Sequence, residues 1–142
     1  MKSLLLSAVL LFTVTFSIAR ADTDLEASMK RIKDASKQLD ADLKLTDDTK
    51  HAKDVDLKSV ATIKDESVKA RALVPKRAQN LPPDQQATMT QNYQKDMDAF
   101  GLDVATLNQD IQGDKWDAAR TDFKKLLDDE SAGHKAYRIK KT

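Results

Sequence analysis

The chain has 142 residues and no cysteine, so neither a disulfide nor a thiolate-bound metal can stabilise its fold. Its 24 basic and 23 acidic side chains nearly balance and are interspersed, whereas a nucleic-acid-binding surface gathers Lys and Arg on one face. We therefore expect no nucleic-acid partner. Charged residues make up 33% of the chain, with only 3 Gly and 3 Pro, which is typical of helices with solvated outer faces and narrow apolar faces.

The first 21 residues have the pattern of a secretory signal peptide. Lys2 precedes an apolar run over residues 4–16 that is too short to span a bilayer, and residues 19–21 include small side chains that suit a signal peptidase. We expect cleavage after Ala21, a single mature domain over residues 22–142, and a periplasmic location. No membrane insertion is expected once the signal is removed.

Apolar residues separated by three or four positions predict the first mature helix over about residues 22–44. Such spacing places them on one face, while Lys, Asp and Gln fill the other positions. Residues 46–49 then interrupt the pattern with side chains that favour turns and helix N-caps. The positions predicted to face the core are Leu25, Met29, Ile32, Ser36, Leu39 and Leu43.

A second helix is predicted from about Thr49 to Val74, because the residue before Pro75 is disfavoured in helical geometry. Residues 76–83 are expected to form an extended loop. Asp84, which directly follows two prolines, is predicted to be the N-cap of the third helix. The second helix keeps its helical spacing at Val60, Ile63, Ser67, Ala70 and Val74.

The third and fourth helices are predicted over about residues 85–112 and 116–138, with a short turn at Gly113-Asp114 between them. Four helices of similar length with short connections predict an all-α, antiparallel up-down-up-down four-helix bundle. Their predicted inward faces comprise Met89, Tyr93, Met97, Phe100, Val104, Leu107 and Ile111, and then Trp116, Ala119, Phe123, Leu126, Glu130, Gly133 and Tyr137.

The chain has only two histidines, and they differ in their surroundings. His51 lies among charged residues near the expected start of the second helix, so we expect it to be solvent-exposed and not a metal ligand. His134 lies beside the apolar face of the last helix. In an up-down-up-down bundle the first and last helices are neighbours, and Met29 and His134 would lie about 10 to 12 Å below the same end. A thioether and an imidazole are suited to be the two axial ligands of a haem iron.

Both terminal helices resemble those of the soluble cytochrome b562 family. The resemblance rests on residues 23–29 (TDLEASM) and on residues 115–138, from KWDAA to HKAYR. It implies a non-covalent haem b held by Met29 and His134, with Tyr93 and Met97 packing against the ring and Arg138 near a propionate. The sequence has no Cys-x-x-Cys-His motif for covalent attachment.

The resemblance implies a monomeric periplasmic electron-transfer protein that is not an enzyme and that exchanges electrons with redox partner proteins. A second hypothesis keeps the bundle without the cofactor, as a haem-free periplasmic helical protein with a binding or stress-related role. The ligand pair separates the two hypotheses, because a protein that had lost haem would be free to lose Met29 or His134. Both residues are present.

Overall fold

The computed structural model describes the backbone of residues 13–139 and the side chains of residues 23–139. Within that part of the chain every element is a helix, which confirms the all-α class. The elements are α1 (Thr13–Leu43), a 3₁₀ turn η1 (Asp48–Lys50), α2 (Lys53–Arg71), α3 (Lys76–Gln79), α4 (Pro83–Gln112) and α5 (Trp116–Tyr137). Residues 1–12 of the expected signal peptide lie outside the described residues. Among the described helices, none is both long and apolar enough to cross a membrane.

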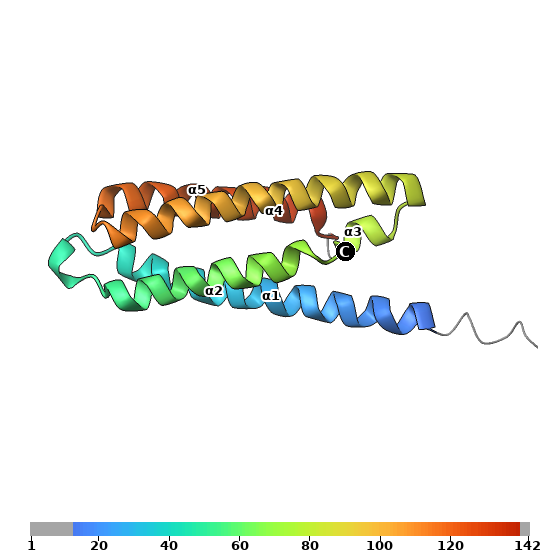
Figure 1. The fold of residues 1–142 in the computed structure, drawn as a ribbon, viewed down its shortest axis with the longest axis horizontal. Helices are drawn as coiled ribbons and strands as arrows, with labels where there is room; N and C mark the ends of the chain where they lie inside the picture. Colours follow the sequence, from blue (N-terminus) through green and yellow to red (C-terminus); the bar gives the residue numbers. More distant parts are fainter. Residues whose placement is uncertain (1–12, 140–142) are drawn as a thin grey trace, which may run out of the picture.

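The four long helices lie side by side along one axis (Figure 1). The pairs α1–α2, α2–α4 and α4–α5 pack extensively, and α1 and α5 touch less extensively. This arrangement is compatible with the expected up-down-up-down bundle. One end, which we call the loop end, comprises residues 44–52 and 113–115. The opposite end, which we call the α3 end, comprises α3, the start of α4 and the end of α5.

The hydrophobic core lies in the half of the bundle nearer the loop end. There the spacing of apolar residues correctly predicts the inward face of each long helix. The α3 end is less tightly filled, since Met29, Met89, Met97 and Tyr137 are only half-buried. The buried core residues are Ile32, Ala35, Leu39, Leu43, Val60, Ile63, Val104, Leu107, Ile111, Trp116, Ala119, Phe123 and Leu126.

The connection between α1 and α2 differs from the prediction. Asp47 caps the 3₁₀ turn instead of α2, because its carboxylate accepts hydrogen bonds from the Thr49 backbone N–H (3.1 Å) and hydroxyl (2.6 Å). α2 therefore begins at Lys53, four residues later than expected. It also ends early, at Arg71, so the chain is already non-helical before it reaches Pro75.

Residues 76–83 are not an extended loop, as the sequence pattern suggested. Pro75 is the N-cap of the short helix α3, and the Gln79 side chain donates a hydrogen bond to the Val74 carbonyl at 3.1 Å. The prediction that Asp84 caps the third helix was also wrong. Pro82 is the N-cap and Pro83 the first helical residue, because proline has no N–H to leave unpaired there and its φ already suits a helix. Asp84 lies in the first turn, where its charge favours the helix dipole.

The inward face of α4 can be tested by comparing two of its leucines. Leu107 has no exposed surface, whereas Leu102 on the same helix is 71% exposed. We expect Leu107→Ala to lower the free energy of unfolding by about 2 to 5 kcal/mol, because it leaves a cavity in the core. The matched change Leu102→Ala should stay within about 0.5 kcal/mol of the parent. Urea unfolding followed by circular dichroism measures both, and equal effects would contradict the assigned inward face.

Candidate functional site

Met29 lies on α1 at the edge of the hydrophobic core. Its side chain is half-buried and packs against the core cluster, and it stands one turn before the buried Ile32. A thioether in this position is shielded on one side by apolar neighbours.

α1 is attached to α2 beside Met29 by a buried carboxylate. Glu66 on α2 is only 5% exposed, and its oxygens lie 2.9 Å from Arg31 Nε and 2.7 Å from Lys69 Nζ. Hydrogen bonds from Lys69 and then from Arg31 and Ser28 outweigh burial and lower the pKa of Glu66 to about 2. This charge network therefore fixes the position of α1 in the neighbourhood of Met29.

The pKa of Glu66 predicts an acid-dependent loss of stability. Because the pKa is lower in the folded protein than its ordinary value of 4.5, the Glu66 contribution is complete above pH 4.5 and disappears as the pH falls towards 2. We expect Glu66→Gln to reduce the pH dependence of thermal unfolding in that interval. Its exposed neighbour supplies the control, since Asp65→Asn should leave the slope unchanged. Identical slopes in the parent and Glu66→Gln would contradict the network.

His134 lies in the last part of α5, and its side chain is exposed. Its backbone carbonyl accepts a hydrogen bond from the Arg138 N–H at 3.2 Å. Within residues 23–139 the imidazole has no hydrogen bond, ion pair or ring contact. Both ring nitrogens are therefore accessible, and a ligand could use either one without breaking a described interaction. Arg138 is also exposed and follows directly after the last residue of α5.

A hydrogen bond at the loop end defines the register of α1 against α5. Arg120 Nε donates to the Leu43 carbonyl at 3.0 Å. Two heptads along α1 from Leu43 is Met29, and two heptads along α5 from Arg120 is His134. Each interval covers about 21 Å of helix and returns to nearly the same face. Counted from this contact, Met29 and His134 have similar heights along the bundle, and their joint ligation of a haem iron stays a prediction.

Tyr93 and Met97 lie one turn apart on α4, and they differ in burial. Tyr93 is 3% exposed, and its hydroxyl donates to the Ala70 carbonyl at 2.8 Å. Its ring packs edge-on against Tyr137, with ring centroids 5.2 Å apart. Burial raises the pKa of Tyr93, so the phenol stays protonated. Met97 is half-buried. Tyr93 is thus part of the packing between α4 and the end of α5.

Tyr137 is the point at which α5 is attached to α4 near the α3 end. Its hydroxyl donates to Asp96 Oδ2 at 2.5 Å. Burial, followed by the hydrogen bond and the negative charge of Asp96, raises the pKa of Tyr137 to about 12. The ring also forms one wall of a cavity, so this contact limits how far the end of α5 can move.

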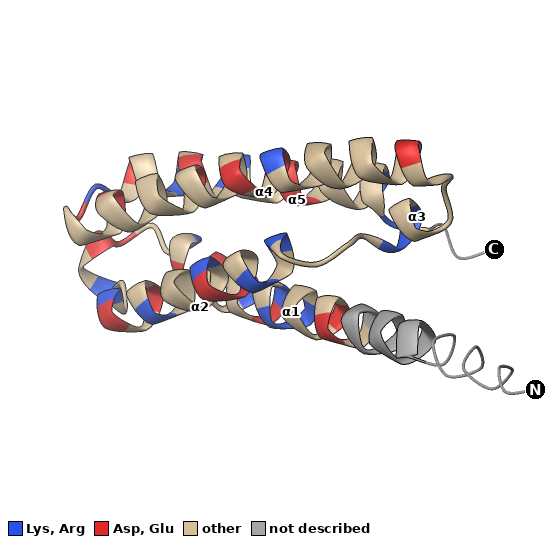
Figure 2. Cartoon of the chain, turned by 45° about the vertical axis from the view of Figure 1, so that its right-hand side comes forward, with Lys and Arg blue, Asp and Glu red and all other residues tan. Residues whose placement is uncertain are grey.

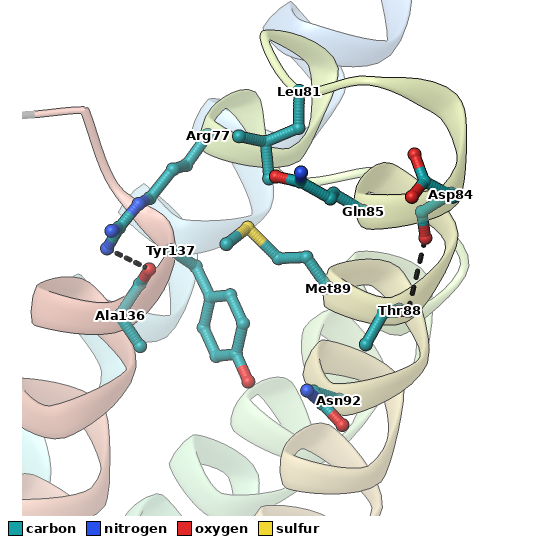
Figure 3. Close-up of a pocket in the computed structure, with 9 residues that line it drawn as sticks. All are labelled: Arg77, Leu81, Asp84, Gln85, Thr88, Met89, Asn92, Ala136 and Tyr137. Atoms are coloured by element: carbon teal, nitrogen blue, oxygen red, sulfur yellow. Dashed lines mark hydrogen bonds between the residues drawn. The ribbon is translucent and has the colours of Figure 1, made fainter.

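The cavity at the α3 end has a volume of about 530 Å³, which is within the range of small-molecule pockets. One side is closed by a hydrogen bond of 2.9 Å from the Arg77 guanidinium to the Ala136 carbonyl (Figure 3). The first turns of α4 beside it carry few charged residues (Figure 2). Neither Met29 nor His134 lines this cavity. Its lining residues are Arg77, Leu81, Asp84, Gln85, Thr88, Met89, Asn92, Ala136 and Tyr137.

A second group of polar residues lies at the loop end, and it overturns the expectation that His51 is solvent-exposed. The His51 side chain has no exposed surface. Its ring stacks on Trp116 with centroids 4.0 Å apart, and Nδ1 lies 2.6 Å from Asp42 Oδ2. Arg120 Nη2 lies 3.2 Å from Nε2, and a guanidinium can only donate. Nε2 therefore accepts, and Nδ1 carries the proton that is donated to Asp42.

Asp42 and Asp56 form a carboxyl pair beside His51. Asp56 has no exposed surface, and burial together with the nearby Asp42 raises the pKa of Asp56 to about 7. For Asp42, burial is opposed by the nearby Asp56 carboxyl and by hydrogen bonds from His51 and the Ala52 N–H, which together lower its pKa. A proton held on Asp56, beside a charged Asp42, accounts for both directions, although neither Asp56 oxygen is placed to form a hydrogen bond with a described residue. Sequence reasoning missed this group because its three members lie on α1, on the connecting segment and on α2.

Comparisons with protein-family models, with curated proteins and with solved structures found no match. The likeness to cytochrome b562 in the terminal helices therefore stays an expectation.

The attachment of the loop end by Arg120 can be tested separately. Its guanidinium donates to the Leu43 and Leu45 carbonyls and to Asp48. We expect Arg120→Ala to lower the free energy of unfolding, because hydrogen bonds from a charged donor are among the stronger ones. We also expect the Trp116 fluorescence to shift towards longer wavelength as the loop loosens.

Arg120→Lys keeps the charge and loses the forked geometry, so it should recover only part of the stability. Lys135→Ala, an exposed cation on the same helix, is the control and should have little effect. Unfolding curves for Arg120→Ala and Lys135→Ala that coincide would show that the contact does not fix the loop.

Proposed function

We propose that the protein is a periplasmic electron carrier, built as an antiparallel up-down-up-down four-helix bundle, that holds one non-covalent haem b between Met29 and His134. The observation that carries the proposal is the α1–α5 register. Arg120 on α5 donates a hydrogen bond to Leu43 on α1, and each expected ligand lies two heptads from its own end of this contact. Met29 and His134 are therefore expected at similar heights on neighbouring helices. The periplasmic location rests on the signal-peptide pattern of residues 1–21.

The donor atoms suit the proposed group. The His134 imidazole has no described partner, so its nitrogen is available to iron. Met29 supplies a sulfur at the edge of the apolar core. When bound, haem would supply a one-electron couple, since a soft thioether favours the reduced metal and two protein ligands leave no open position for substrate.

The surrounding residues give further support. α1 and α5 pack less extensively than the other neighbouring helices, and Met97 is half-buried. Tyr93 is fixed by its hydroxyl and by its contact with Tyr137, so it would help to hold the end of α5 that carries His134. The exposed guanidinium of Arg138, four residues after His134, can pair with a carboxylate such as a propionate.

The test is a haem titration of the purified protein followed by visible absorption in the oxidised and reduced forms. We expect saturable one-to-one binding and sharp low-spin bands after reduction. His134→Ala should abolish the low-spin spectrum without unfolding the protein, because the side chain is exposed. Lys135→Ala, its exposed neighbour, is the matched control and should bind haem as the parent does.

Met29→Leu keeps the apolar volume and removes the sulfur ligand. We expect this variant to fold, to bind haem more weakly and to have a lower reduction potential, because the sulfur stabilises the reduced iron. Unchanged spectra and potentials in Met29→Leu and His134→Ala would rule out this ligand pair. No saturable binding to the parent would leave the haem-free periplasmic protein as the remaining hypothesis.

A further inference from the structure

Three potential metal ligands meet at the loop end, far from the proposed haem ligands. Asp42 comes from the last turn of α1, His51 from the connecting segment and Asp56 from the first turn of α2. One donor atom from each lies within 4.8 Å of the other two. Met29 precedes Asp42 by nearly two heptads, or about 20 Å of helix, so this group is separate from the proposed haem site.

Asp56 gives an independent reason to look for a ligand. Its side chain is fully buried, and neither carboxylate oxygen has a hydrogen-bond partner among the described residues. An unpaired carboxylate is costly to bury, so such a group calls for a proton or a cation. The potential ligand atoms nearest to the Asp56 carboxylate in this group belong to Asp42 and His51. Asp42 is itself negatively charged, so it cannot neutralise Asp56.

We propose that Asp42, His51 and Asp56 form a binding site for one divalent transition-metal ion of the zinc type. Two carboxylates balance the charge of a divalent ion, and three protein ligands with a water molecule complete a tetrahedral zinc site. The imidazole nitrogen selects against Ca²⁺ and Mg²⁺, which prefer oxygen ligands. The ion takes the place of the proton on His51 Nδ1 and of the proton on Asp56, and both protons go to solvent.

The residues around His51 are arranged to support such a site. When Nδ1 binds a metal, the ring proton is on Nε2 and needs an acceptor. Asp48 Oδ1 lies 3.4 Å from Nε2 and accepts this proton once Arg120 Nη2, which lies 3.2 Å from Nε2 in this structure, donates to Asp48 alone (2.8 Å). A carboxylate behind a metal-bound histidine orients the ring and strengthens the ligand. Stacking on Trp116 fixes the plane of the ring, and the 14% exposure of the Asp42 side chain gives an ion a way in.

The experiment uses the purified protein after treatment with a chelator. We expect calorimetric titration with Zn²⁺ to show one site, and thermal unfolding to shift to a higher temperature as the ion is added. Mg²⁺ and Ca²⁺ at the same concentrations should have no effect. The chain has a single tryptophan, Trp116, so paramagnetic Co²⁺ should quench its fluorescence saturably if the ion binds beside His51.

Four variants locate the site. Asp56→Asn and His51→Gln should each weaken Zn²⁺ binding at least about 100-fold and remove the Co²⁺ quenching. Two controls should bind Zn²⁺ as the parent does: Asp54→Asn, an exposed acid in the same turn as Asp56, and His134→Ala, which removes the proposed haem ligand and so separates the two sites. Circular dichroism checks that each variant is folded.

The outcomes are distinct. Absence of one-to-one Zn²⁺ binding to the parent would overturn the proposal. Binding that survives in Asp56→Asn and is lost in His134→Ala would also overturn it. Quenching of Trp116 in the parent protein gives a readout that does not depend on how well the variants fold. It also locates the ion, because His134 is about 27 Å of helix from Trp116 and an ion bound at His134 would leave the Trp116 fluorescence unchanged.

Discussion

The guanidinium of Arg120 joins the end of the first long helix and the following loop to the last helix. Arg120, in the first turns of α5, donates hydrogen bonds to the carbonyls of Leu43 and Leu45, where α1 ends, and to Asp48 in the following turn. The last carbonyls of a helix have no partner within the helix, and a cation favours the negative end of its dipole. A single side chain therefore caps α1, holds the loop to α5 and sets the register of the first helix against the last.

The two ends of the bundle differ in how tightly their side chains are packed. At the loop end the core is complete, with Leu39, Val104, Leu107 and Ile111 fully buried, and the polar residues there are hydrogen-bonded or lie beside His51. At the α3 end the inward side chains are half-buried and a cavity opens between α3, α4 and α5. Binding sites are commonly drawn from the less stable parts of a protein, whereas the well-packed parts supply rigidity. The proposed haem ligands lie towards the less tightly packed end.

The sequence predicted what depends on periodicity and missed what depends on tertiary contact. Each long helix and its inward face follow from apolar residues spaced three and four apart, because that spacing places them on one side of a helix. The burial of His51 could not be predicted in this way. Its surroundings in sequence are charged, and the residues that cover it, Trp116 and Arg120, lie far along the chain. The prediction that Asp84 caps α4 was wrong because Pro82 and Pro83 start this helix without a side-chain cap. The proposed ligand roles of Met29 and His134 rest on their depth in the bundle and on the resemblance of the terminal helices, and no local residue pattern specifies them.

The rigidity of helices connects the two ends. α1 carries both Asp42 and Met29, and α5 carries both Arg120 and His134. A packed helix changes length very little, so a contact fixed at the loop end determines relative heights about 21 Å away. Glu66 then limits sideways movement of α1 beside Met29, and the Tyr137–Asp96 hydrogen bond does the same for the end of α5. The relative positions of Met29 and His134 therefore depend on contacts at both ends of the same two helices.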